Sequence, residues 1–413
     1  MSSMSAASAP AAGFRRDATV ISLVGFCHGT SHFFHFVLPT LFPWLMRDFG
    51  LTFTQVGATM TVFFVVSGVG QALAGFVVDR FGALRVLYGG IGLLSIAAAG
   101  IGMAQNLPML LAAAAVAGLG NSVFHPADFT LLNRSVSHSR LGHAFSVHGL
   151  SGSLGWAAAP VFVASVAEAF GWRAAAIGAA IVGFFALSFL HFNREQLVEG
   201  EISAEHRKGS GGTFAFLGSG VVWMCFFFFL FAVMAFGALQ NFAPPILERT
   251  YHVTLTFAAS GLTAYLLGNA AGIAAGGFFA RGEHQERLVA FALSFAALCA
   301  ILLASGAVPG WSIVALMGLM GFGSGFTGPS RDILVRRAAT SAFGAAAYGR
   351  VYGFVYSGID TGLAIAPVVF GALMDAARYS QVLWGVAVLQ TFAIFTALAV
   401  GWRAAAAVRS QAA

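Results

Sequence analysis

The sequence predicts an all-α integral membrane protein in which twelve transmembrane helices form two pseudo-symmetric six-helix bundles. Three observations predict this fold class. Hydrophobic residues make up 58% of the 413 residues, charged residues make up 9%, and the mean hydropathy is +0.84. Apolar segments long enough to cross a bilayer recur along the whole chain, and motifs of the first half return in the second half.

The composition indicates that lipid, and not water, surrounds most of the chain. A soluble domain carries roughly 25% charged residues, far more than the 9% found here. The three cysteines, Cys27, Cys225 and Cys299, lie far apart in apolar segments. Their spacing matches neither a disulfide framework nor a cysteine metal motif, and we expect no cofactor.

The apolar segments are each long enough for a helix that crosses a hydrocarbon core of about 30 Å at about 1.5 Å per residue. In chain order the predicted spans are 18–46, 55–78, 84–104, 107–134, 142–167, 172–193, 214–242, 255–280, 286–306, 310–337, 346–373 and 380–402.

The polar segments divide the chain into two bundles. The longest of them joins the sixth and seventh spans and is rich in Glu, Ser and Gly, which is typical of a flexible linker. We expect a disordered N-terminus, a first bundle, a cytoplasmic linker, a second bundle and a cytoplasmic tail. Their residues are 1–17, 18–193, 194–213, 214–403 and 404–413.

The basic residues predict the orientation of the chain. Of the 21 Lys and Arg residues, only Arg47, Arg173, Arg249 and Arg378 fall on the side away from the two termini. Basic residues favour the cytoplasmic side of a membrane. We therefore expect cytoplasmic termini in a bacterial inner membrane. The net charge of +6 then reflects topology, and no nucleic-acid partner is needed to explain it.

The internal repeat supports the two-bundle prediction and suggests a function. Gly142, Gly155 and Pro160 match Gly349, Gly362 and Pro367 at an offset of 207 positions. Two more pairs of segments match at offsets of 203 and 204, namely 118–126 with 321–329 and 51–53 with 255–257. Two similar apolar halves are typical of transporters whose substrate site lies between the halves.

One segment between the second and third spans reads G-F-V-V-D-R-F-G-A-L-R, from residue 75 to residue 85. It resembles the loop signature of the major facilitator superfamily. The resemblance implies the major facilitator fold and a conformational latch in this loop. The latch would consist of Gly75, Asp79, Arg80, Gly82 and Arg85.

Three further motifs resemble the fosmidomycin-resistance family of that superfamily. They are S-H-F-F-H at 31–35, S-V-F-H-P at 122–126 and R-L-G-H-A-F-S-V-H-G-L-S-G at 140–152. The resemblance covers the whole chain and is strongest over the first five spans. It implies efflux of a small molecule, typically an antimicrobial, driven by proton entry.

The first span carries three histidines on one helix face. His28, His32 and His35 stand at positions i, i+4 and i+7, so a helix places all three together. Ionisable groups inside a membrane are costly and mark functional sites. We expect these histidines to line a cavity and bind substrate, and His32 also to carry a proton, since imidazole titrates near neutral pH.

The fourth and fifth spans add a second polar set. Asn121, His125 and Asp128 repeat the i, i+4, i+7 spacing, and the fifth span offers His148. Pro126 should bend the fourth span and free a backbone carbonyl. We predict a proton relay of His125, Asp128 and His148, with Asn121 at the substrate. The alternative is a hydrogen-bonded network that only fixes packing.

The second half offers different polar groups for the opposite wall of the cavity. We expect Gln240, Asn241, Tyr356 and Asp360 to bind substrate there. Arg331 is a further candidate because a guanidinium binds anionic groups well. An inner gate of ion pairs is the alternative for Arg331.

These observations predict a proton-coupled exporter of a small drug-like or anionic organic molecule, acting by alternating access as a monomer. A second hypothesis is export of a divalent transition metal or metal chelate, with His28, His32, His125 and Asp128 as ligands. A third is proton-coupled uptake of a small organic anion. An enzyme is not expected, because the sequence shows no nucleophile constellation and no cofactor motif.

Overall fold

The computed structural model describes residues 10–137, 140–197, 215–279, 284–343 and 348–412. In these residues 12 helices are long and apolar enough to cross a membrane, which confirms the predicted number of spans. The longer helices are α1 (Pro10–Phe34), α2 (Val37–Phe49), α3 (Phe53–Phe81), α4 (Ala83–Met103), α5 (Leu107–Asn121), α6 (Phe124–Ser135), α7 (Leu141–Phe170), α8 (Trp172–Phe192), α9 (Gly220–Tyr251), α10 (Leu255–Phe279), α11 (Gln285–Ala304), α12 (Ile313–Phe343), α13 (Tyr348–Asp375) and α14 (Tyr379–Ala412).

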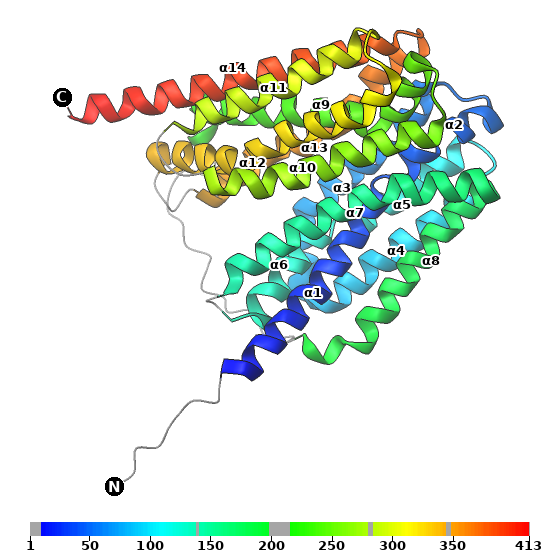
Figure 1. Ribbon diagram of the computed structural model, residues 1–413. Helices are drawn as coiled ribbons and strands as arrows, with labels where there is room; N and C mark the ends of the chain where they lie inside the picture. The colour runs from blue at the N-terminus through cyan, green and yellow to red at the C-terminus, as the bar shows by residue number, and fades with distance from the viewer. Residues whose placement is uncertain (1–9, 138–139, 198–214, 280–283, 344–347, 413) are drawn as a thin grey trace.

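The helices form two bundles, α1–α8 and α9–α14, as the repeat predicts. In Figure 1 the bundles lie side by side at one end and diverge toward the end where both chain termini lie. We call that end the terminal side and the other end the opposite side.

Two predicted spans are interrupted, and a proline follows each interruption. The first span breaks between α1 and α2 at His35 and Phe36, and the fourth breaks between α5 and α6 at Ser122 and Val123. Pro39 and Pro126 stand four residues after His35 and Ser122. Because proline has no N–H, it leaves the carbonyl four residues earlier without its helical partner. The predicted bend of the fourth span therefore lies one turn before Pro126.

Both ends of the described chain are helical. Residues 10–17, expected to be disordered, belong to α1, and residues 404–412 of the expected tail belong to α14. Most of the expected linker, 198–213, lies outside the described residues.

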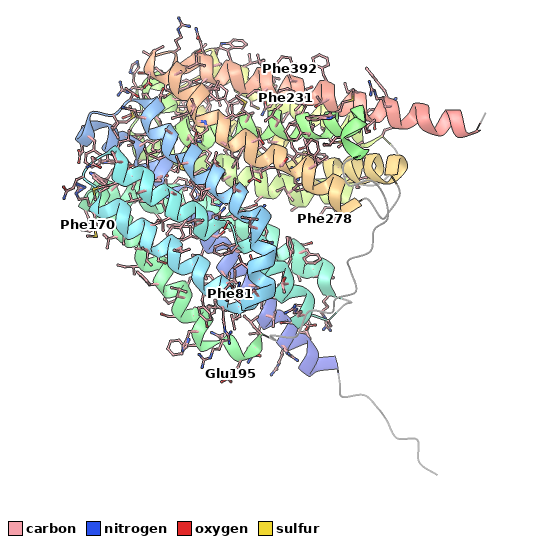
Figure 2. All side chains as sticks on the ribbon, turned by 180° about the vertical axis from the view of Figure 1, so that it is seen from behind. Phe81, Phe170, Glu195, Phe231, Phe278 and Phe392 are labelled. Carbon is pink, nitrogen blue, oxygen red and sulfur yellow. The ribbon has the colours of Figure 1, made fainter. Side chains whose placement is uncertain are left out.

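Large apolar side chains cover the outside of both bundles. Phe170, Phe278 and Phe392, labelled in Figure 2, have exposed fractions of 78%, 75% and 48%. A soluble monomer rarely exposes apolar surface on this scale. These faces fit contact with lipid tails, in agreement with an integral membrane protein.

Two contacts between the bundles, which we call the α3/α13 seam and the α7/α10 seam, are related by the repeat. In the first, the Thr61 hydroxyl donates to the Ala364 carbonyl at 2.7 Å. In the second, the Thr263 hydroxyl donates to the Ala157 carbonyl at 3.1 Å. All of these residues lie in the parts of their helices toward the opposite side, so the bundles meet there.

The same contacts show which residues of α3 and α10 are equivalent in the two bundles, and this differs from the match found in the sequence. Thr61 and Thr263 differ by 202 positions, and so do Thr52 and Thr254, whose hydroxyls accept the backbone N–H three residues later at the starts of α3 and α10. In the structure, residues of α3 and α10 are therefore equivalent at an offset of 202 positions. The sequence match of 51–53 with 255–257 is displaced from this by two residues.

Candidate proton and substrate site

Asp128 is the centre of a buried polar cluster in the first bundle. Its side chain is fully buried in α6. Its Oδ2 lies 3.1 Å from Nδ1 of His28 on α1 and 3.0 Å from Nε2 of His148 on α7. Three helices thus bring two imidazoles to one carboxylate oxygen. A buried carboxylate needs such hydrogen-bond donors to remain ionised.

The imidazole rings of this cluster pack against one another. The rings of His28 and His148 are stacked, with centroids 3.5 Å apart and an interplanar angle of 24°. The centroid of His32 lies 4.3 Å from that of His28. His125 is exposed, and its ring centroid lies 5.3 Å from that of His28. The cluster therefore reaches the surface of the protein through His125.

Two buried polar atoms of the cluster have no hydrogen-bond partner among the described residues. They are Oδ1 of Asp128 and Nδ1 of His32. Unpaired buried polar atoms are rare in folded proteins because they lose the hydrogen bonds they made to water. These atoms are therefore available to a proton or to a polar group of a substrate.

His35 is held in one tautomer by two neighbours. The indole N–H of Trp156 donates to Nδ1 of His35 at 3.2 Å. An indole can only donate, so Nδ1 carries a lone pair and Nε2 carries the proton. Nε2 then donates to Oδ1 of Asn121 at 2.8 Å, and the Asn121 amide donates to Ser67 at 2.8 Å. His35 is thus a fixed neutral imidazole, and protonation of Nδ1 would break the bond from Trp156.

The second bundle contacts the cluster through the break between α1 and α2. The side-chain amide of Gln240 on α9 donates to the His35 carbonyl at 3.1 Å. This is the carbonyl that Pro39 leaves without a helical partner. The ring of Phe236, also on α9, lies 5.1 Å from that of Trp156. These contacts lie on the face of the cluster that is directed toward the opposite side of the molecule.

Two glycines of α7 make room for the cluster. A Cβ at Gly152 would lie 2.8 Å from the His32 ring and 3.1 Å from Nε2 of His28. A Cβ at Gly155 would lie 1.9 Å from the Gly29 carbonyl oxygen of α1. The glycine spacing of the fifth span therefore allows α1 and α7 to approach closely enough for their imidazoles to stack.

The cluster fits a shared proton better than a metal ion. One nitrogen each from His28, His125 and His148 lies within 4.8 Å of the others, which is close enough to consider a metal. However, the His28 and His148 rings are stacked, and each directs one nitrogen at Asp128. Metal ligands converge on a single point from different directions, which two nearly parallel rings do not do.

The second-bundle residues that were expected to line the substrate cavity lie in four different environments. Gln240 contacts the cluster, as described above. Asn241 is fully buried and donates to Gly237 of its own helix at 2.7 Å. Arg331 and Tyr356 both lie against Phe229 of α9, with the guanidinium 4.7 Å from the ring centre. Asp360 lies in the α3/α13 seam, where a Cβ at Gly68 would be 3.3 Å from its Cβ.

The predicted latch segment lies at the turn between α3 and α4. Gly82 caps α3 with a φ of +87°, a value that favours glycine. The Arg80 guanidinium lies 5.4 Å from the Phe81 ring centre, and Arg85 is exposed. The Asp79 side chain and the surroundings of Gly75 lie outside the described residues.

Sequence reasoning missed Trp156 and Ser67. Both contact the cluster through side-chain hydrogen bonds, and neither titrates, so a search for charged groups inside the membrane passes over them. Trp156 carries one available signal: it stands between glycines and Pro160 in the middle of a span, where a large polar-tipped ring is unusual.

Comparison with known proteins identifies the class of protein. The family model of the Major Facilitator Superfamily matches residues 21–347. The chain therefore belongs to this superfamily and is a secondary transporter for small molecules in a membrane, not an enzyme.

Individual relatives are similar to the chain to different extents. An uncharacterized MFS-type transporter of Bacillus subtilis, YfnC, is 26% identical over 392 residues, which is 92% of each chain. The fosmidomycin resistance protein of Escherichia coli is 27% identical over 157 residues, 37% of each chain, so this comparison supports the expected whole-chain resemblance only in part.

Solved structures support the fold. A bacterial homologue of the human lysosomal transporter Spinster, in an inward-facing and occupied conformation, has a TM-score of 0.74 with 14% sequence identity. The match covers 94% of this chain and 96% of the other. At this identity the similarity concerns the fold alone.

Proposed function

We propose that this transporter exports a small drug-like or anionic organic molecule from a bacterial cell in exchange for protons. The observation that carries the proposal is Asp128, fully buried and bonded to both His28 and His148. A buried carboxylate shared by two imidazoles is a chemical group that can gain and lose a proton within a membrane.

The sidedness of the structure supports alternating access. Basic residues concentrate on the terminal side, which we take as cytoplasmic. The bundles meet on the opposite side and diverge toward the terminal side (Figure 1), so this conformation is inward-facing. Rocking of the two bundles about the histidine cluster would expose it to the other side of the membrane.

The geometry of the cluster favours one transferred proton per cycle. With Asp128 ionised and both histidines neutral, each imidazole donates one hydrogen bond to the carboxylate. A first additional proton neutralises the group of three. A second would leave the buried group with a net positive charge. If both protons were on the imidazoles, two positive rings would lie with their centroids 3.5 Å apart, a repulsion of roughly 5 kcal/mol at an effective dielectric constant of about 20. The second protonation is therefore disfavoured.

Export is the direction that the relatives support. Two of them carry names that refer to resistance, the fosmidomycin resistance protein of Escherichia coli and a multidrug resistance protein B homolog of Mycobacterium tuberculosis. The half-buried Arg331 suits an anionic group on the substrate. Proton-coupled uptake of an organic anion uses the same parts in the reverse direction, and a vectorial assay separates the two.

The test uses purified protein in proteoliposomes that contain a pH-sensitive dye. Phosphonates, antimicrobial drugs and divalent metals are added one at a time, with and without an imposed proton gradient. Proton movement triggered by an organic compound, against its gradient, is expected. Transport of a compound without any pH change would overturn proton coupling, and proton movement triggered by metals alone would replace the organic substrate with a metal.

Replacement of Asp128 by Asn tests the proton site directly. Asn keeps the shape of the side chain but cannot carry the negative charge that the proton neutralises. We expect proton-coupled transport to fall at least about 100-fold, the scale of a lost proton-transfer group, while substrate binding remains.

The matched control is Asp48→Asn, because Asp48 accepts a hydrogen bond from Trp172 at 2.6 Å in the same bundle but outside the cluster. Coupling should be retained in this control. Coupled transport by the Asp128→Asn protein at the wild-type rate would contradict the assignment.

A further inference from the structure

Asp375, the last residue of α13, binds the first turn of α3 in the other bundle. Its carboxylate accepts hydrogen bonds from the backbone N–H of Phe53 and, at 3.0 Å, from that of Thr54. It also accepts one from the Thr54 hydroxyl at 2.5 Å. We call this set of contacts the inter-bundle cap. It lies at the end of the α3/α13 seam on the opposite side.

The inter-bundle cap completes the hydrogen bonding of the α3 N-terminus. The first N–H groups of a helix have no partner within the helix. Thr52 satisfies the N–H of Gln55, and the Gln55 side chain in turn accepts from the Thr52 N–H. The N–H groups of Phe53 and Thr54 remain, and Asp375 accepts both. The start of α3 is therefore fully paired only while the two bundles are in contact.

Electrostatics favour the same arrangement. A carboxylate at the C-terminus of its own helix faces the negative end of that helix, which is unfavourable, whereas the N-terminus of another helix attracts it. Asp375 occupies both positions at once. Because its side chain remains exposed to solvent, separation of the bundles would return it to water without trapping a buried charge.

The repeat gives an internal comparison, because the α7/α10 seam lacks this cap. The counterpart of Asp375 at an offset of 207 is Glu168, near the end of α7. Glu168 is exposed and makes no hydrogen bond to any described residue. The counterpart of Thr54 at an offset of 202 is Thr256, whose buried hydroxyl has no partner. Among the residues that the structure describes, only one of the two repeat-related seams carries a charged bond between the bundles.

We propose that the inter-bundle cap is a one-sided gate lock: it holds the opposite side closed along α3/α13, and the bundles separate more readily along α7/α10. The proposal rests on alternating access but not on proton coupling or on the identity of the substrate. It predicts that the closed state loses stability when Asp375 is neutralised, and not when Glu168 is.

The experiment measures distances between two spin labels on the full-length protein in lipid nanodiscs, without substrate or proton gradient. The labels are attached to cysteines introduced at Gln105 and Ala307, exposed residues of different bundles on the opposite side. The native Cys27, Cys225 and Cys299 are buried. The readout is the ratio of long to short distances, which reports opening and is independent of transport.

Asp375→Asn should raise the ratio of open to closed molecules about three- to tenfold, the effect of losing an exposed charge-assisted bond at a helix N-terminus. Glu168→Gln, the repeat-matched control, should leave the ratio unchanged. An unchanged ratio in Asp375→Asn, or an equal shift in Glu168→Gln, would overturn the proposal.

A second pair of variants covers the case in which Asp375→Asn does not fold. Thr54→Val removes one donor to the carboxylate and leaves both backbone bonds, so a smaller shift toward the open state is expected. Its control is Thr256→Val, which removes a hydroxyl that has no partner and should cause no shift. If Thr54→Val and Thr256→Val behave alike, the lock does not exist.

Discussion

In the first bundle α6 buries Asp128 between two histidines, whereas the equivalent position of the second bundle, at an offset of 203, is Arg331 beside Phe229. His148 on α7 corresponds to Val355 on α13 at an offset of 207. Pro126 and Pro329 remain at equivalent positions in the two bundles, so the scaffold is repeated where the titratable groups are not.

The two bundles share a scaffold but differ in their polar groups, which indicates different roles. The glycines and prolines of the repeat set how closely helices approach and where carbonyls are freed, and both bundles need these features. A proton site needs a buried charge with specific donors, and one such site is sufficient. We infer that the first bundle carries the proton and the second bundle contributes contacts to the substrate and to the gate.

Of the substitutions that make the two bundles more alike, His148→Val, which introduces the repeat counterpart, should have the largest effect on stability and coupling. Asp128 would keep only the bond from His28, and a buried carboxylate that loses a donor costs about 2–3 kcal/mol. We expect a lower free energy of unfolding, seen as a lower melting temperature in detergent, together with loss of proton coupling.

The double variant His148→Val/Asp128→Asn separates the two effects. Removing the charge should restore most of the stability, because the remaining amide costs less to bury, but it should not restore coupling. If the two substitutions destabilise the protein additively, Asp128 and His148 do not interact as the structure indicates.

Much of the fold could be predicted from the sequence because the membrane restricts the possible structures. Apolar length predicts the spans, and the repeat predicts the two bundles. The spacing of His28, His32 and His35 also places them together, and the break in the helix at His35 does not separate them. The helical ends of α1 and α14 could not be predicted in this way, because these polar and alanine-rich segments lack the hydropathy pattern of a span.

The site could be predicted only in part because its contacts join different helices. Asp128 and His148 of the predicted relay are hydrogen-bonded, but His28 is the second partner of Asp128, and His125 is exposed beside the cluster. Helical spacing shows which residues share a face and not which face a neighbouring helix presents. The bond from Gln240 to the His35 carbonyl also depends on how the two bundles dock, which no periodicity records.

Trp156→Phe changes a position at which the second bundle has Leu363. Phe can keep the ring stacked on His32, 4.5 Å away in the wild type, but it removes the N–H that fixes the His35 tautomer. We expect a loss of about 1 kcal/mol in the free energy of unfolding, the usual value of a neutral hydrogen bond. Calorimetry measures this, and His35 should become protonatable at Nδ1 in nuclear magnetic resonance spectra. A histidine spectrum identical to that of the wild type would contradict the role of Trp156.

Arg331→Gln tests the second bundle and should have the smallest effect on stability. The guanidinium contact with Phe229 is worth about 0.5–1 kcal/mol at a partly exposed site. Proton coupling should persist, because we propose the proton site in the other bundle, whereas KM for an anionic substrate should rise several-fold through loss of the positive charge. Transport kinetics in proteoliposomes separate the two quantities, with a neutral substrate of similar size as the control. Loss of coupling in Arg331→Gln together with retained coupling in Asp128→Asn would reverse the roles of the two bundles, because it would place proton coupling in the second bundle.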